Sequence, residues 1–300
     1  MALQTEIWIS SIINGLFADN SFLSHAVNHD QFVNNKTVHV PNAGKGSGVK
    51  KNRSTYPASV GKRTDVDLTY QLDTYTTDPV HLPNAESIEL SYDKRESVLS
   101  QDRATLHDSI AKGMLKNWAP DDASRIIATT GKAVVAHTTS ATGNRKAITK
   151  ADVLSLMTQF NKDNVPSEGR WLLLDAVMYS QLLADLTTQE ATAFHALADP
   201  ARGIMGKLFT FNILQRSEVV VYDGNSPKEV GENPQAADKA AAIAWHEQSV
   251  ARAMGETQMY SKEGDPTYYG DIYSFEVRMG GAILRADKKG VAAIVQSPTA

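Results

Sequence analysis

Three stretches decide the fold of this 300-residue chain: KTVHVPNAGKGSGVKKNRS (36–54), VDLTYQL (66–72) and SYDKRESVLSQDRATLHDSIAKGMLKNW (91–118). In the second stretch apolar and polar residues alternate strictly, as in a strand with one covered face. Each of the two arms of this ribbon has up to ~20 residues. At ~3.3 Å per residue an arm reaches on the order of 60 Å, beyond the radius of a domain of this size. Because an isolated two-stranded ribbon is marginal in water, we expect its covered face to lie on another copy of the chain.

The third stretch predicts one long amphipathic helix. Its apolar residues recur at spacings of seven and four, which places them on one stripe: Tyr92, Leu99, Leu106, Ile110, Met114 and Trp118. At ~1.5 Å per residue the helix is about 40 Å long. Pro120 ends it, because the residue before a proline is steered out of the helical region. Such a helix can serve as the spine of a flat, elongated subunit.

Size and composition narrow the class of protein. The hydrophobic content of 42% is ample for a real core, and 300 residues suit two packed subdomains. The net charge of -4 argues against a dedicated nucleic-acid binder, which is usually basic across a whole face. The chain has no cysteine, which excludes disulfides, thiolate catalysis and cysteine-ligated zinc.

The N-terminal segment has apolar residues but no cationic start, and it contains Glu6, so we expect no signal peptide. No run of about eighteen apolar residues occurs, so we expect no membrane span. A broad helical stripe predicts either a core helix or an arm on a neighbour; it consists of Ile7, Trp8, Ile9, Ile12, Ile13, Leu16 and Phe17.

The middle of the chain predicts a compact α/β subdomain. Thr149 and Asp152 form the N-terminal signal of a helix whose inward stripe is Val153, Leu154, Met157 and Phe160. The continuous apolar run 171–174 predicts a buried strand, and Asp175 can cap the helix that follows it.

The last part of the chain predicts strands. Residues 225–238 predict an exposed loop. Apolar Tyr273, Phe275, Val277 and Met279 alternate with polar residues, as in a strand buried on one face. Gly280–Gly281 predicts a bend or bulge in it. Residues 291–295 are expected to close the chain as the hairpin partner of Ile283 and Leu284.

This order of elements resembles the major capsid proteins of tailed bacteriophages, which have the Hong Kong 97 fold. The most similar stretches are RWLLLDAVMYSQLLAD (170–185), GKLFTFNILQRSEV (206–219) and YYGDIYSFEVRMGGAILRADKKGVAAIV (268–295). The resemblance implies an α+β subunit with an N-terminal arm (1–36) and an extended β-hairpin loop (37–85). It further implies a peripheral domain with the spine helix (86–132 and 241–283) and an axial domain with a central sheet and flanking helices (133–240 and 284–300).

The implied function is geometric. Hexamers and pentamers of the chain would form an icosahedral shell around double-stranded DNA, assembled in the cytoplasm of the host bacterium and retained in the virion. Scaffolding, portal and decoration proteins are further expected partners, with only weak, non-specific contact to the DNA and none to a membrane. An encapsulin-like shell that encloses proteins is the nearest alternative, and a soluble oligomeric α/β enzyme is a second one.

The chemistry of single residues favours a structural protein over an enzyme. GKGSGVKK (44–51) lacks the phosphate-loop spacing, and Val250 stands where a zinc protease that began at His246–Glu247 would need its second histidine. His25 and His29 lie four apart but have no third ligand at a recognisable spacing. We therefore assign no catalytic, cofactor-binding or metal-binding residue.

The segment 36–63 holds seven lysines and arginines and no acidic residue. It can dock on an acidic surface of a neighbouring subunit, contact DNA, or stay solvated. We favour docking, because tight phosphate binding would resist both packing and ejection of DNA. The residues expected at the contact are Lys45, Lys50, Lys51, Arg53, Lys62 and Arg63. Some relatives join such a lysine to a peripheral asparagine; no asparagine follows Asn233, so we expect no such cross-link.

Overall fold

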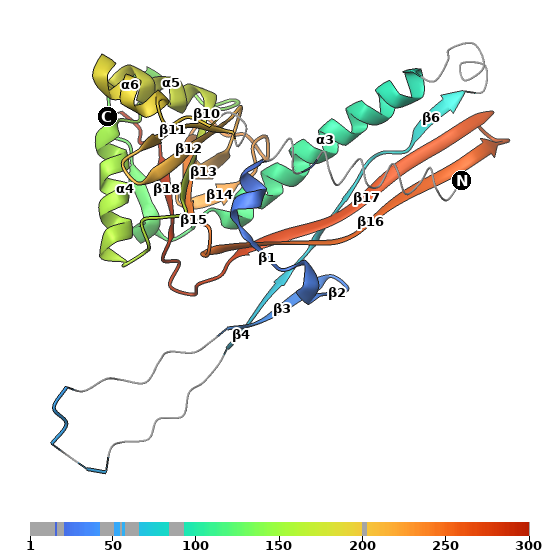
Figure 1. Cartoon of the computed structure of the whole chain (residues 1–300). Helices are drawn as coiled ribbons and strands as arrows, with labels where there is room; N and C mark the ends of the chain where they lie inside the picture. Colours follow the sequence, from blue (N-terminus) through green and yellow to red (C-terminus); the bar gives the residue numbers. More distant parts are fainter. Residues whose placement is uncertain are drawn as a thin grey trace.

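The structure is a computed structural model that describes residue 16 and residues 21–42, 51–54, 56–57, 66–83, 93–199 and 203–299. The subunit has an α+β architecture with two main sheets (Figure 1). An eight-stranded sheet and three helices form a compact body, and a five-stranded sheet with one long helix projects from it. Among the described helices, none is both long and apolar enough to cross a membrane.

The eight-stranded sheet has the order β11-β12-β10-β15-β13-β14, with β18 on β15 and β7 on β18. Its strands are β7 (Ile126–Ala128), β10 (Arg170–Asp175), β11 (Ile204–Leu208), β12 (Phe211–Arg216), β13 (Val220–Asp223), β14 (Ser226–Lys228), β15 (Lys239–His246) and β18 (Val291–Val295). One apolar cluster fills each face of this sheet. Because both faces are covered, all residues of β10 and β18 are buried, which explains their continuous apolar runs.

Three helices cover one face: α4 (Lys150–Lys162), α5 (Ala176–Asp185) and α6 (Thr188–His195). Both predicted caps are confirmed: Thr149 and Asp152 form a capping box, and Asp175 accepts a hydrogen bond of 2.6 Å from the Met178 amide. The expected inward position of Leu154 is wrong, since this side chain is 44% exposed. Leu156 is fully buried in its place, because the helix turns its face of positions 153, 156 and 160 toward the sheet.

The projecting part combines α3 (Asp93–Trp118) with a long hairpin, β16 (Val250–Asp265) and β17 (Gly270–Ile283). Strands β5 (Asp73–Thr76) and β6 (Val80–Pro83) pair with β17, and β1 (Val27–Asn28) pairs with β16. The predicted helix is confirmed, and its apolar stripe is buried: Leu106, Ile110, Met114 and Trp118. The side chains of Tyr92 and Leu99 lie outside the described residues.

The two glycines of β17 do not form the predicted bulge. Gly280 and Gly281 stay in register with Ala253 and Arg252, and the register shifts of the hairpin lie further toward its tip. A Cβ on Gly281 would lie 2.6 Å from Met114 Cε and 2.7 Å from Trp118 Nε1. The glycine is therefore required for the close approach of α3 to the hairpin.

The closing strand also differs from its prediction. β18 does not pair with Ile283 or Leu284; it lies antiparallel to β15 and parallel to β7 in the eight-stranded sheet. The polar turn before it carries the chain from one sheet to the other, and Gly290 allows this path through its positive φ of 81°. Part of the predicted loop 225–238 is also a strand, since β14 pairs back on β13.

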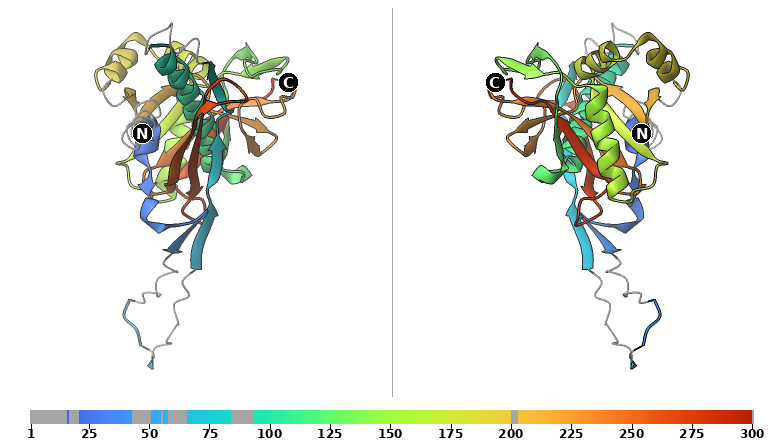
Figure 2. Two further views of the ribbon diagram at one scale, coloured as in Figure 1. Left: turned by 90° about the vertical axis from the view of Figure 1, so that its right-hand side faces the viewer. Right: turned by 90° about the vertical axis from the view of Figure 1, so that its left-hand side faces the viewer.

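The ribbon is confirmed as a hairpin of β3 (Thr37–Asn42) and β4 (Val66–Gln71), with the short β2 (Val33–Asn34) beside β3. At the root of the ribbon, the same subunit covers the apolar face, since Val38 and Leu72 are buried against Ala253 of β16. The expectation of a neighbour under the whole face is therefore wrong for these residues. The long hairpin supplies the cover, because the ribbon crosses it at its base (Figure 2).

The N-terminal segment packs over a group of tryptophans. In η1 (Ser21–His25), Phe22 meets Trp118 edge-on, and His25 stacks on Trp171 with 3.5 Å between ring centroids. Leu16 is also buried in this core. The rest of the predicted stripe, namely Ile7, Trp8, Ile9, Ile12, Ile13 and Phe17, lies outside the described residues. The remaining short elements are η2 (Asp30–Phe32), η3 (Ala123–Arg125), and the hairpin of β8 (Ala133–Val135) and β9 (Asn144–Lys146).

Candidate assembly surfaces

The root of the ribbon is fixed to the long hairpin by polar contacts. The His29 amide donates to the Arg252 carbonyl at 2.8 Å, and the Met254 amide donates to the Asp30 carboxylate at 2.7 Å. His29 Nδ1 lies 3.2 Å from the Tyr70 hydroxyl. Burial lowers the pKa of the His29 imidazole and raises the pKa of the Tyr70 hydroxyl, so both side chains are neutral near pH 7. The ribbon therefore leaves the body from a fixed base.

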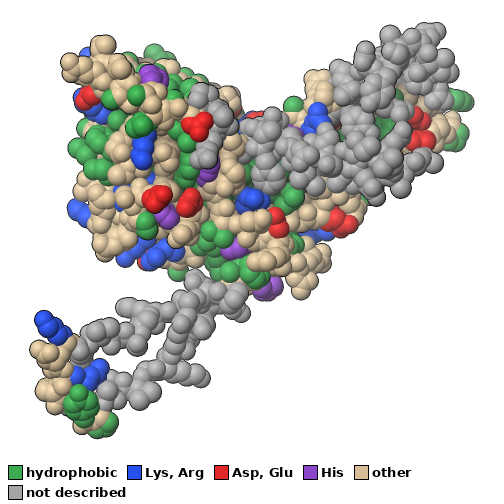
Figure 3. All heavy atoms as spheres, viewed as in Figure 1, with side chains coloured by type: hydrophobic (Ala, Val, Ile, Leu, Met, Phe, Trp, Pro, Cys, Tyr) green, Lys and Arg blue, Asp and Glu red, His purple; other side chains and the backbone are tan. Residues whose placement is uncertain are grey.

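The basic segment carries the residues predicted to touch a neighbour. Lys51 is exposed and Arg53 is half-buried, while Lys45, Lys50, Lys62 and Arg63 lie outside the described residues. Residues 51–54 and 56–57 of this segment lie away from the body and include Lys and Arg but no Asp or Glu (Figure 3). On the visible face of the body the two signs of charge are interspersed. This difference in charge pattern makes the segment a candidate contact surface.

The far half of the long hairpin carries the opposite charge. Residues 255–271 contain four acidic side chains, Glu256, Glu263, Asp265 and Asp271, and one basic side chain, Lys262. Hydrogen bonds from Lys262 and from the Thr267 amide lower the pKa of Asp265 to about 2. Among the described residues only β6 pairs beside this half of β17. The hairpin thus presents a negative surface beyond the compact body.

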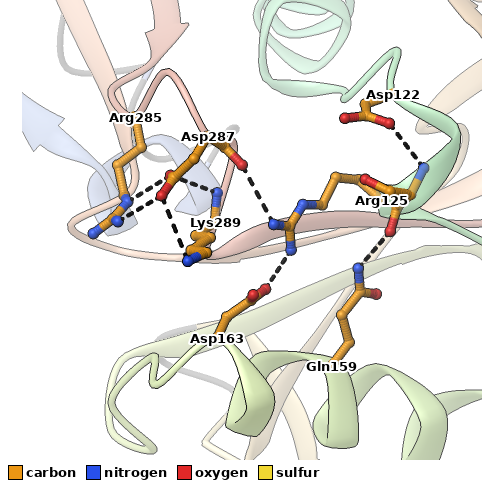
Figure 4. A network of polar contacts seen from close by, with 8 residues as sticks. Asp122, Arg125, Gln159, Asp163, Arg285, Asp287 and Lys289 are labelled. Atoms are coloured by element: carbon orange, nitrogen blue, oxygen red, sulfur yellow. Dashed lines mark hydrogen bonds and ion pairs between the residues drawn. The ribbon is translucent and has the colours of Figure 1, made fainter.

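A polar joint links the projecting part to the body (Figure 4). Arg125 of η3 pairs with Asp163 after α4 and also donates to the Asp287 carbonyl. The Asp287 carboxylate accepts two hydrogen bonds from Arg285, at 2.8 and 2.9 Å, which hold its pKa well below the ordinary value. The joint lies where the chain passes from α3 into β7 and from β17 into β18. It therefore fixes both connections to the end of α4.

Four of the described histidines, His25, His29, His137 and His246, have structural partners. His137 Nε2 lies 2.9 Å from Asp175, whose other oxygen caps α5, and the buried His246 Nδ1 accepts from the Gln248 amide. His25 and His29, considered above as a metal pair, contact Trp171 and Tyr70 instead. Within the described part of the chain, no group of three or more His, Asp or Glu side chains is arranged to hold a metal ion.

Comparison with known proteins shows likeness in structure without likeness in sequence. No protein-family model and no curated protein matches the sequence. The chain is similar to the capsid of Ralstonia phage GP4, with a TM-score of 0.61 and 13% identity over 92% of this chain and 88% of that one. It is also similar to the capsid structure of the cyanophage P-SCSP1u, with a TM-score of 0.57 and 17% identity over 90% and 85%. The chain is also similar to a virus-like particle from Pyrococcus furiosus, with a TM-score of 0.56 and 11% identity over 97% of this chain and 99% of that one.

The chain therefore has the fold of tailed-phage capsid structures, the Hong Kong 97 fold that the order of its sequence elements predicts. The joint of Arg125, Asp163 and Asp287 was not predicted from the sequence. The only signal for it was the polar composition of the turns near Asp122 and Asp287, because residues more than a hundred positions apart meet there.

Proposed function

We propose that this chain is the major capsid protein of a tailed bacteriophage. Copies of it would assemble as hexamers and pentamers into an icosahedral shell that encloses double-stranded DNA. One observation carries this proposal: the likeness to phage capsid structures extends over about nine-tenths of the chain, at 90% and 92% coverage. Helix α3 and the hairpin β16–β17 bury apolar residues such as Ile110, Met114 and Phe275 within the subunit, and the outer surfaces of these projections are proposed to contact neighbouring copies.

Electron microscopy of the purified, expressed chain tests this function. Closed particles of uniform size are the expected result. A small, discrete oligomer under every assembly condition would contradict the proposal and favour the soluble enzyme. We assign no residue a catalytic role, because the described polar clusters are occupied by hydrogen bonds and ion pairs that join secondary-structure elements.

We propose a division of the subunit that follows its sheets. The arm (1–36) and the extended loop (37–85) keep the bounds predicted from the sequence. Strand β15 lies inside the range 241–283 assigned to the peripheral domain, yet it pairs at the centre of the eight-stranded sheet. The boundary is better placed near Gln248, so that α3, β16 and β17 form the peripheral domain and the eight-stranded sheet forms the axial domain.

The extended loop is proposed to dock on the long hairpin of the next subunit. Its six basic residues would meet a hairpin whose residues 255–271 include four acidic side chains and one basic one. Opposite charges of this kind set the register and speed of association more than its final affinity. The contact residues are Lys45, Lys50, Lys51, Arg53, Lys62 and Arg63. Reversing Lys50 and Lys51 to Glu should slow assembly, and reversing Glu256 and Glu263 to Lys in the same chain should restore it.

An encapsulin-like shell is the second candidate, supported by the likeness to the virus-like particle, which covers nearly the full length of both chains. The contents of native particles separate the two candidates. Nuclease-protected DNA in tailed particles supports the capsid protein, whereas small particles filled with protein support the encapsulin-like shell. For the phage, the virion is the proposed location, with assembly in the host cytoplasm and with scaffolding, portal and decoration proteins as further partners.

A further inference from the structure

Strand β11 is an edge of the eight-stranded sheet, where Ile204 at its start exchanges two backbone hydrogen bonds with Asp199. It pairs with β12 and lies at one end of the strand order. Alternate residues point out of the subunit: Met205 is 36% exposed, Phe209 is 44% exposed, and Lys207 is also exposed. Gly206 and Leu208 between them face the core with Phe194 and Phe211. Proteins usually blunt a free edge that carries apolar residues, because it offers a template for pairing.

The turn after β11 is strained at an aromatic residue. Phe209 has a φ of +51°, in the left-handed region that Gly or Asn occupies more readily than a bulky side chain. Its ring gives little to the core of its own subunit, since nearly half of it is exposed. The two-residue turn between Leu208 and Phe211 accounts for the positive φ and holds the exposed ring where a partner can contact it.

The charge of this edge is positive. The hairpin from Ile204 to Arg216 contains Lys207 and Arg216 and no acidic residue. Arg216 pairs with Asp108 of α3, whereas Lys207 forms no ion pair within the described residues. Lys207 is therefore the charge on this edge that a partner can use.

The opposite edge of the same sheet is hollow and negative. Strand β14 lies at the other end of the strand order, and the two edges appear on opposite sides of the subunit when it is viewed along its length (Figure 2). A hollow of about 370 Å³ there is lined by Asp223, Lys228, Glu232, Asn233, Gln235 and Ala237. The segment 220–238 holds four acidic residues and one lysine; that lysine pairs with Asp238, and Lys116 of α3 pairs with Glu232, so the segment together with Lys116 keeps a net charge of about −2. Asp223 is exposed at the rim.

We propose that these two edges bind each other in neighbouring copies of the chain. Lys207 of one copy would pair with Asp223 of the next, and Phe209 would enter the hollow behind β14. The occupant is a second copy because the two surfaces have opposite charge and lie at opposite ends of one sheet. A contact between two different surfaces of identical subunits continues from copy to copy, and it closes into a ring when the rotation between copies divides a full turn, as it does in a pentamer or hexamer. The inference rests on the proposed shell function and names the ring contact within it.

Covalent coupling tests the pairing directly. The chain has no cysteine, so a K207C/D223C variant carries only the two thiols of interest. Treatment of its particles with a short bismaleimide should give a denaturing gel ladder that ends at five and six subunits. The matched control K207C/K162C keeps the first thiol and moves the second to the exposed end of α4; it should give no ladder.

Charge reversal gives an independent measurement. K207E should lower the yield of particles on the order of tenfold or more, because like charges then face each other across the contact. K207R should assemble normally, and K207E/D223K should recover much of the lost yield. Particles of K207C/D223C without a ladder, or K207E particles in normal yield, would overturn the ring contact and leave the shell function standing. Failure of the unaltered chain to form particles would instead remove the shell function itself.

Discussion

The eight-stranded sheet and the β3–β4 ribbon differ in how far their apolar residues are buried within the subunit. Every residue of β10 and β18 is buried, because α4, α5 and α6 cover one face of the sheet and the core around α3 covers the other. Among the described side chains of the ribbon, only Val38 and Leu72 at its root are buried, and Tyr56 near its tip is 75% exposed. The sheet thus stabilises the subunit by itself, whereas the ribbon is the part that we propose gains its partners by assembly.

The largest effect is expected in the spine helix α3, whose apolar stripe belongs to the core of the subunit. Ile110→Asp places an unpaired charge at a fully buried position and should cost several kcal/mol, enough to abolish folding. Circular dichroism and solubility measure this loss. The exposed neighbour gives a matched control, since Ser109→Asp should fold normally. A soluble Ile110→Asp subunit that melts like the unaltered chain would remove α3 from the core.

A smaller effect is expected at the joint between the two parts. Arg125→Met leaves the Asp163 carboxylate, only 15% exposed, without its ion pair and should cost about 1–3 kcal/mol in the free energy of unfolding. Arg285→Met is the control, because this side chain is 55% exposed and should cost less than about 1 kcal/mol. Urea unfolding of both variants gives the two values. Equal losses would show that the buried pair does not hold the joint.

The root of the ribbon should add a weak dependence on pH. Burial lowers the pKa of folded His29 below 6.5, with a partial opposing effect of Asp30, so the unfolded chain takes up the proton first as the pH falls. The unfolded state then binds more protons, and stability decreases as the pH falls through about 6.5. In His29→Gln, the free energy of unfolding measured with urea should depend less on pH between about pH 7.5 and about pH 5.5.

His246→Gln serves as the reference for this measurement, since burial also lowers the pKa of His246. That variant should keep the part of the pH dependence that belongs to His29. If His29→Gln and the unaltered chain give the same slope, the imidazole is not neutral and buried at the ribbon root in solution.

The least effect on the subunit is expected from removing the end of the ribbon. Asn42 pairs with Val66, so deletion of residues 44–63 leaves Ala43, Thr64 and Asp65 as a short turn between paired strands. The free energy of unfolding should change by less than about 0.5 kcal/mol, because the deleted segment adds no described residue to the core. Assembly should fail, which electron microscopy and sedimentation would show. Normal particles from the deletion variant would refute the docking role of the basic segment.

Local patterns predicted the elements that depend on neighbours in sequence. The apolar stripe of α3 and the caps of α4 and α5 each depend on residues within one or two helical turns. The spacing of Leu106, Ile110 and Met114 was therefore sufficient to predict the buried face of α3. The partner of β18 and the need for Gly281 depend on residues far away in the chain. The sequence pattern therefore paired β18 with Ile283 and Leu284, which is wrong, and of the bend or bulge expected at Gly280–Gly281 the bulge does not form.

The sequence by itself determined a chain with a self-sufficient core and a basic ribbon too long for it, because hydrophobic periodicity and charge are local properties. Only the tertiary structure decided what covers the ribbon root, how Arg125 and Asp287 join the two parts, and which two edges of the sheet face outward. These features come from contacts between residues separated by tens to hundreds of positions. Their pairing is set when the whole chain packs, and no periodicity within a segment records it.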